Sequence, residues 1–171
     1  MRILGIDPGV SETGWAVLEE DSSRALSLRA SGCVRTAPPE ALGDRLRRIH
    51  SAIADLLAEH RPDWVALEEM FFLKAAHTIR ATLQARGVIL LAASQSKTPL
   101  REYNPRQVKS SLTGSGKADK AQMGKMVQRT LALAEPLRPD DTADAAAIAL
   151  CHLRMGRLRG LRVLDKVGGR S

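Results

Sequence analysis

Short apolar and strand-like segments, separated by turn residues, make up the first part of the chain. An apolar run at Arg2–Ile6 ends in a turn sequence, and strand-like segments follow at Thr13–Glu19 and Leu26–Arg35 with a short polar break between them. Consecutive strands with short connections pair side by side. The pattern therefore predicts an antiparallel meander of three strands.

The rest of the chain changes to helical periodicity, interrupted by two short apolar strands at Trp64–Leu67 and Pro99–Tyr103. Strands that alternate with helices are typical of a sheet covered by helices. The sequence thus predicts an α/β fold with a mixed five-stranded sheet flanked by helices. The predicted helices are Glu40–His60, about Lys74–Ser96, Asn104–Leu112, Ala118–Ala134 and Asp140–Met155.

The 171 residues fit one ordinary domain with its own core. Residues 1–156 carry all the periodic segments and are predicted to form that domain. Residues 157–171 have little apolar periodicity, and we expect them to be a basic, mobile C-terminal tail. The tail's basic residues are Arg157, Arg159, Arg162, Lys166 and Arg170.

The charge balance favours a polyanionic partner. The chain has 26 Lys and Arg against 19 Asp and Glu, a net charge of +7. Such an excess favours nucleic acid ahead of a membrane surface, although a solvated basic surface would give the same balance.

The two cysteines and the apolar runs indicate the compartment. Cys33 and Cys151 are too few and too far apart for a disulfide framework, and we expect both to be reduced, buried thiols. No run of residues has the length of a signal segment or a membrane span. The sequence predicts a cytoplasmic protein without a membrane partner.

Two carboxylates follow predicted strands. Asp7 comes directly after the first strand and Glu68 after the fourth, and sites in α/β folds form at the carboxyl ends of strands. Adjacent strand residues point to opposite faces, so only one of Glu68 and Glu69 can join Asp7. Glu68 is favoured because Leu67 then packs on the opposite side. A plain turn aspartate remains an alternative for Asp7.

Three aspartates open the last predicted helix. Asp140 fits a structural role at the helix N-terminus, whereas Asp141 and Asp144 are three residues apart and share one face. Four carboxylates gathered at one place would repel one another unless cations lay between them. Hard oxygen ligands suit Mg²⁺ or Mn²⁺, and two such ions roughly 3.5–4 Å apart can drive phosphodiester cleavage.

Three motifs taken together resemble the RuvC Holliday-junction resolvases: Ile6-Asp7-Pro8-Gly9, Leu67-Glu68-Glu69-Met70-Phe71 and Asp141-Thr142-Ala143-Asp144-Ala145. The resemblance spans nearly the whole chain. It implies an RNase H-like fold and a homodimer that cuts four-way DNA junctions by paired symmetric nicks in recombination and repair. Two Mg²⁺ or Mn²⁺ ions per active site are implied, as are the branch-migration proteins RuvA and RuvB as partners. The nicks would leave 5′-phosphate and 3′-hydroxyl ends.

The resemblance also assigns roles to residues. The catalytic and metal-binding set corresponds to Asp7, Glu68, Asp141 and Asp144, and the essential lysines correspond to Lys109 and Lys120. Some relatives have His where Asp141 stands. Phe71 corresponds to a residue that stacks on a base at the crossover. The other expected DNA contacts are Phe72, His77, Arg80, Arg106 and, in the Gly-rich loop, Lys117.

Other classes remain open from sequence alone. Asp7, Gly9, Thr13 and Gly14 loosely match the first hairpin of actin-like ATP-binding proteins, but those need a second similar domain that 171 residues cannot supply. A ribonuclease H acting on RNA–DNA hybrids shares the expected chemistry. A junction-binding protein without catalysis shares the expected charge.

Overall fold

The computed structural model describes the backbone of residues 1–69 and 76–167, and the side chains of residues 1–69 and 80–156. The strands are β1 (Arg2–Asp7), β2 (Glu12–Glu20), β3 (Leu26–Arg35), β4 (Trp64–Glu68) and β5 (Leu100–Tyr103). The helices are α1 (Leu42–His60), α2 (Ala76–Gln95), α3 (Pro105–Thr113), α4 (Lys120–Thr130) and α5 (Asp140–Val167).

The strands form one mixed sheet in the order β3-β2-β1-β4-β5. β1, β2 and β3 pair antiparallel, whereas β4 runs parallel to β1 and β5 runs parallel to β4. The predicted meander and the mixed five-stranded sheet are therefore confirmed.

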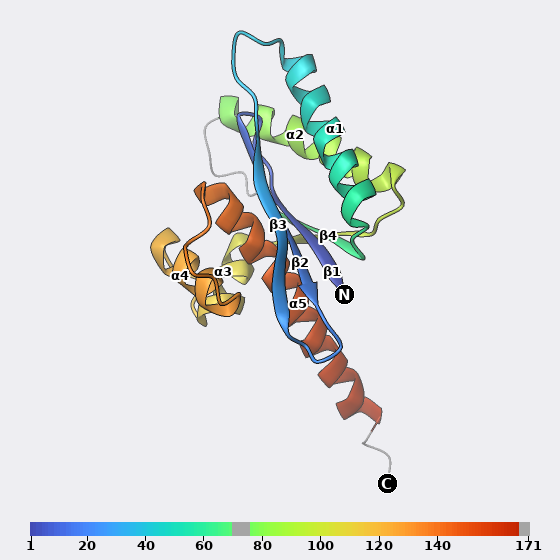
Figure 1. Ribbon diagram of the computed structural model, residues 1–171, viewed down its shortest axis with the longest axis vertical. Coiled ribbons are helices and arrows are strands. Elements are labelled where there is room, and N and C mark those ends of the chain that lie inside the picture. Colours follow the sequence, from blue (N-terminus) through green and yellow to red (C-terminus); the bar gives the residue numbers. More distant parts are fainter. Residues whose placement is uncertain (70–75, 168–171) are drawn as a thin grey trace.

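Helices cover both faces of the sheet (Figure 1). On one side, α1 and α2 pack their apolar stripes, including Ile53 and Ile89, against Leu4 and Leu67. On the other side lie α3, α4 and α5, and the alanine-rich segment 145–149 of α5 packs directly on the central strands. Small side chains there let the helix axis come close to the sheet.

Two predicted helix ends were wrong. α4 ends at Thr130 rather than Ala134, because the chain turns at Ala132, which has a left-handed backbone with φ of 49°. α5 continues past Met155 to Val167, since Gly156 and Gly160 each disfavour a helix only weakly and no proline follows. Its far end extends beyond the sheet (Figure 1). The division at residue 156 into domain and tail stays a prediction.

Burial separates the two cysteines. Both are free thiols. Cys151 is buried as predicted, whereas Cys33 is only partly buried, so the prediction of burial was wrong for Cys33. Within the described part of the chain, no helix combines the length and the apolar character needed to cross a bilayer.

Candidate active site

The sheet brings Asp7 and Glu68 to one place. β1 and β4 run parallel with Ile6 opposite Leu67, so the residues that follow these two, Asp7 and Glu68, lie at neighbouring strand ends. Ile6 and Leu67 both pack under α1 and α2. Strand alternation therefore turns Asp7 and Glu68 toward the face that α5 covers. Glu69, by contrast, is exposed.

Two glycines let the first turns of α5 approach these strand ends. A Cβ atom at Gly14 in β2 would overlap the carbonyl oxygen of Asp141, and one at Gly5 in β1 would overlap that of Ala145. Only glycine permits so close an approach of two backbones. As a result, Asp7, Asp141 and Asp144 each offer a carboxylate oxygen, and these oxygens all lie within 4.8 Å of one another.

Burial and the neighbouring carboxylates shift the pKa of Asp7 upward. Burial, followed by the charges of Glu68, Asp144 and Asp141, raises the pKa of Asp7 from its ordinary value of 3.8 to about 8. Without a cation, Asp7 is therefore largely protonated at neutral pH. A set of hard oxygen donors whose mutual repulsion a cation would relieve fits a divalent metal such as Mg²⁺ or Mn²⁺.

Lys120 lies beside this cluster. A capping box of Asp119 and Gln122 starts α4 at Lys120. The Lys120 Nζ atom is 3.4 Å from Oδ2 of Asp144, and the negative charge of Asp144 raises the pKa of Lys120. The lysine in turn partly offsets the upward shift in the pKa of Asp7. Lys120 thus places a positive charge beside the carboxylate cluster.

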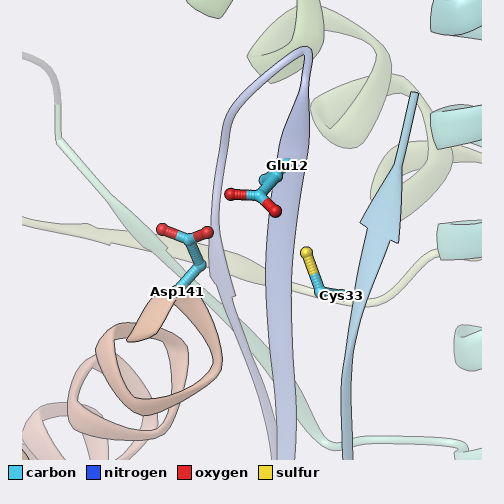
Figure 2. A group of neighbouring side chains, drawn as sticks. All are labelled: Glu12, Cys33 and Asp141. Carbon is cyan, nitrogen blue, oxygen red and sulfur yellow. The ribbon is translucent and has the colours of Figure 1, made fainter. Parts of the chain in front are cut away.

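Glu12 is a neighbour of the site that sequence reasoning missed. Glu12 from β2, Cys33 from β3 and Asp141 from α5 point toward one another, with ligand atoms within 4.8 Å (Figure 2). Burial and then Glu12 raise the pKa of Asp141, while Arg35, whose Nε is 3.0 Å from Oε1 of Glu12, helps to lower the pKa of Glu12. Asp141 therefore stands between two groups of possible ligands.

The other predicted site residues with described side chains lie on α3, on α2 and in the loop before α4. Lys109 is half-buried on α3, and among the described residues no ion pair joins it to an acidic side chain. The remaining predicted cations are exposed: Arg106 on α3, Lys117 in the loop before α4 and Arg80 on α2.

Three predicted DNA contacts cannot be placed. Phe71 and Phe72 lie outside the described residues. His77 belongs to α2, but its side chain is also outside them.

Fold and site together define the class. A mixed five-stranded sheet with acidic side chains gathered at the ends of β1 and β4 and at the start of α5 is the arrangement of an RNase H-like nuclease. The family model described as crossover junction endodeoxyribonuclease RuvC matches residues 3–152. This chain belongs to the RuvC family of crossover junction endodeoxyribonucleases.

Individual relatives agree with this assignment. The RuvC of Endomicrobium trichonymphae is 47% identical over 153 residues, which are 90% of this chain and 80% of the relative. The RuvC of Salinispora arenicola is 46% identical over 159 residues, which are 93% of this chain and 91% of the relative.

Solved structures also match. The structure of Thermus thermophilus RuvC superposes with a TM-score of 0.85 at 37% identity, covering 92% of this chain and 96% of that one. A structure of T. thermophilus RuvC in complex with Holliday junction substrate gives the same TM-score at 34% identity and the same coverage.

Proposed function

We propose that this protein is a structure-selective endonuclease that resolves four-way DNA junctions. It makes paired symmetric nicks that leave 5′-phosphate and 3′-hydroxyl ends, in homologous recombination and DNA repair. The observation that carries the proposal is the convergence of Asp7, Asp141 and Asp144, next to Glu68, in a chain of the RuvC family. The net charge of +7 suits a polyanionic substrate.

Divalent cations complete the proposed site. Asp7, Glu68, Asp141 and Asp144 would hold two ions, Mg²⁺ or Mn²⁺, because these metals prefer hard oxygen ligands. When bound, the pair supplies Lewis-acid activation of water and stabilises charge on the departing oxygen.

The chain's own residues orient the substrate. Lys120, which is held 3.4 Å from Asp144, would stabilise negative charge at the scissile phosphate, and Lys109 would assist from α3. Phe71 would stack on a base at the crossover. Further proposed contacts to the junction are Phe72, His77, Arg80, Arg106 and Lys117.

Paired nicks require two active sites, so we propose a homodimer. Leu83, Gly87 and Leu91 are exposed on α2 at a spacing of four residues, which puts an apolar stripe on the surface. The stripe suits a symmetric helix-to-helix contact with a second copy. RuvA and RuvB would be the branch-migration partners, and the complex would act in the cytoplasm.

Cleavage of a synthetic junction tests the proposed function. With Mg²⁺ or Mn²⁺ the protein should nick a four-way junction at symmetric positions, and it should spare linear duplex and an RNA–DNA hybrid. Asp7→Asn should retain junction binding and lose cleavage. Preferential cutting of the hybrid would instead indicate a ribonuclease H, and metal-independent binding without any cutting would indicate a non-catalytic junction-binding protein.

A further inference from the structure

Two hollows flank α4. The first, of about 410 Å³, lies between α4 and the start of α5 and has Lys120 and Asp144 in its wall, so it opens beside the carboxylate cluster. The second, of about 700 Å³, lies against the loop before α4 and has Lys117 in its wall. Lys125 and Gln128 line both hollows. The two hollows therefore adjoin along α4 and lead away from the active site.

The second hollow carries uncompensated positive charge. Its wall includes Lys117, Lys125 and Arg129 and no acidic residue. All three cations are exposed, and within the described part of the chain none has an acidic group within ion-pair distance. Lys125 and Arg129 are four residues apart on one helix, where like charges repel and weaken the helix. An anionic ligand over this surface would remove that repulsion.

The first hollow differs because its charges are paired. Lys120 pairs with Asp144 at 3.4 Å, and Arg138 pairs with Asp140 at 3.2 Å. Of the basic residues in its wall, only Lys125 lacks such a pair among the described residues. Positive charge without a counter-charge thus begins at Lys125 and increases with distance from the carboxylates.

We propose that the two hollows form one track, the α4 track, for the sugar–phosphate backbone of the strand being cut. This inference rests on the proposed function and adds the path of the substrate beyond the scissile phosphate. Lys125, where the hollows meet, contacts one backbone phosphate, and Lys117 and Arg129 contact phosphates further along. Contacts to phosphates carry no sequence information, so the track positions the strand and does not read its bases.

The salt dependence of junction binding tests the track. The parent protein carries Asp7→Asn, so that it should bind the junction without cutting it. Junction binding is measured for this parent and for the parent with either Lys125→Gln or Arg129→Gln added. Each lost phosphate contact should reduce the slope of log K against log salt by about 1 and weaken binding at every junction sequence alike. Arg47→Gln is the control for the loss of one charge. Arg47 is exposed on α1 at the other face of the sheet, where it pairs with Asp44 at 3.3 Å.

Folding does not confound this test. Replacing Lys125 by Gln removes a like-charge pair from α4, so the melting temperature should stay the same or rise. Arg129 also lies in the last turn, where a cation stabilises the helix, so Arg129→Gln should change the melting temperature little. The control must bind with the parent's slope. If Lys125→Gln and Arg129→Gln also keep the parent's slope, the α4 track is wrong while the proposed function stands. If the parent itself binds no junction, the proposed function fails first.

Uncharged phosphate analogues can locate the phosphate that Lys125 contacts. Binding of the parent and of its Lys125→Gln variant is measured on a set of junctions, each with one phosphate near the cut replaced by methylphosphonate. At one phosphate position, the loss of binding free energy caused by the methylphosphonate and the loss caused by Lys125→Gln should not add, because each change removes the same charge pair. Losses that add at every position beyond the scissile phosphate would overturn the assignment of Lys125 to the strand.

Discussion

At the scale of single residues, the Asp7 carboxyl would connect stability to the proposed metal binding. Its pKa of about 8 in the fold exceeds its ordinary value of 3.8, so the folded state binds this proton more tightly than the unfolded state does. As the pH rises from about 4 to 8, the metal-free protein therefore loses stability through Asp7. A divalent cation competes with the proton, and its affinity should rise over the same range.

Replacing Asp7 by Asn should stabilise the metal-free protein. The difference in melting temperature between Asp7→Asn and the natural chain should be small near pH 4 and grow toward pH 8. A gain of about 2 kcal/mol in the free energy of unfolding would raise the melting temperature by about 4–8 °C for a chain of this size. Thermal melts in a chelator measure this, with Asp55→Asn on the exposed face of α1 as the control. If Asp7→Asn and the natural chain melt at the same temperature both near pH 4 and near pH 8, the raised pKa of Asp7 is contradicted.

Glu12 gives a second prediction. Because Glu12 contributes to the raised pKa of Asp141, Glu12→Gln should lower the pKa of Asp141 in the metal-free protein. Titration of the carboxyl carbons by ¹³C NMR measures the pKa directly. Arg47→Gln, distant from the site, should leave it unchanged. A pKa of Asp141 that stays the same or rises in Glu12→Gln would show that the two carboxylates do not interact.

At the scale of helices and strands, local sequence patterns predicted most of the features that position the candidate active site. Strand ends at Asp7 and Glu68, and the shared face of Asp141 and Asp144, follow from periodicity along the chain. Glu12 does not, because its position near Asp141 depends on how closely α5 packs on β2. That approach is set by Gly14, a residue whose role is visible only once the two backbones are side by side.

Alanine substitutions at two glycines should affect stability differently, because only Gly14 lies in the close contact of α5 with the sheet. Gly14→Ala should destabilise the protein by about 1–3 kcal/mol and impair cleavage, because the added methyl displaces Asp141. Gly43→Ala, in α1 with open space around the new atom, should be neutral or stabilise by up to about 1 kcal/mol. Denaturant unfolding and junction cleavage measure both. Equal stability of the two variants would contradict the proposed role of Gly14.

At the scale of the whole molecule, the proposed symmetric cutting would require two copies to pair. Charged residues in the exposed stripe of α2, as in Leu83→Glu with Leu91→Glu, should shift the protein from dimer to monomer in sedimentation equilibrium. The monomer should make single, unpaired nicks in a junction at a reduced rate. Leu42→Glu, at an exposed leucine on α1, is the control. A variant that stays dimeric would place the interface elsewhere.

The proposed cleavage depends on the convergence of acidic side chains into one cluster that would bind divalent metal. Anomalous diffraction from a crystal soaked in Mn²⁺ tests it most directly. We expect anomalous density between Asp7, Glu68 and Asp144, with Asp141 completing the ligands. No bound ion at Asp7, or an ion held only by Glu12, Cys33 and Asp141, would contradict it.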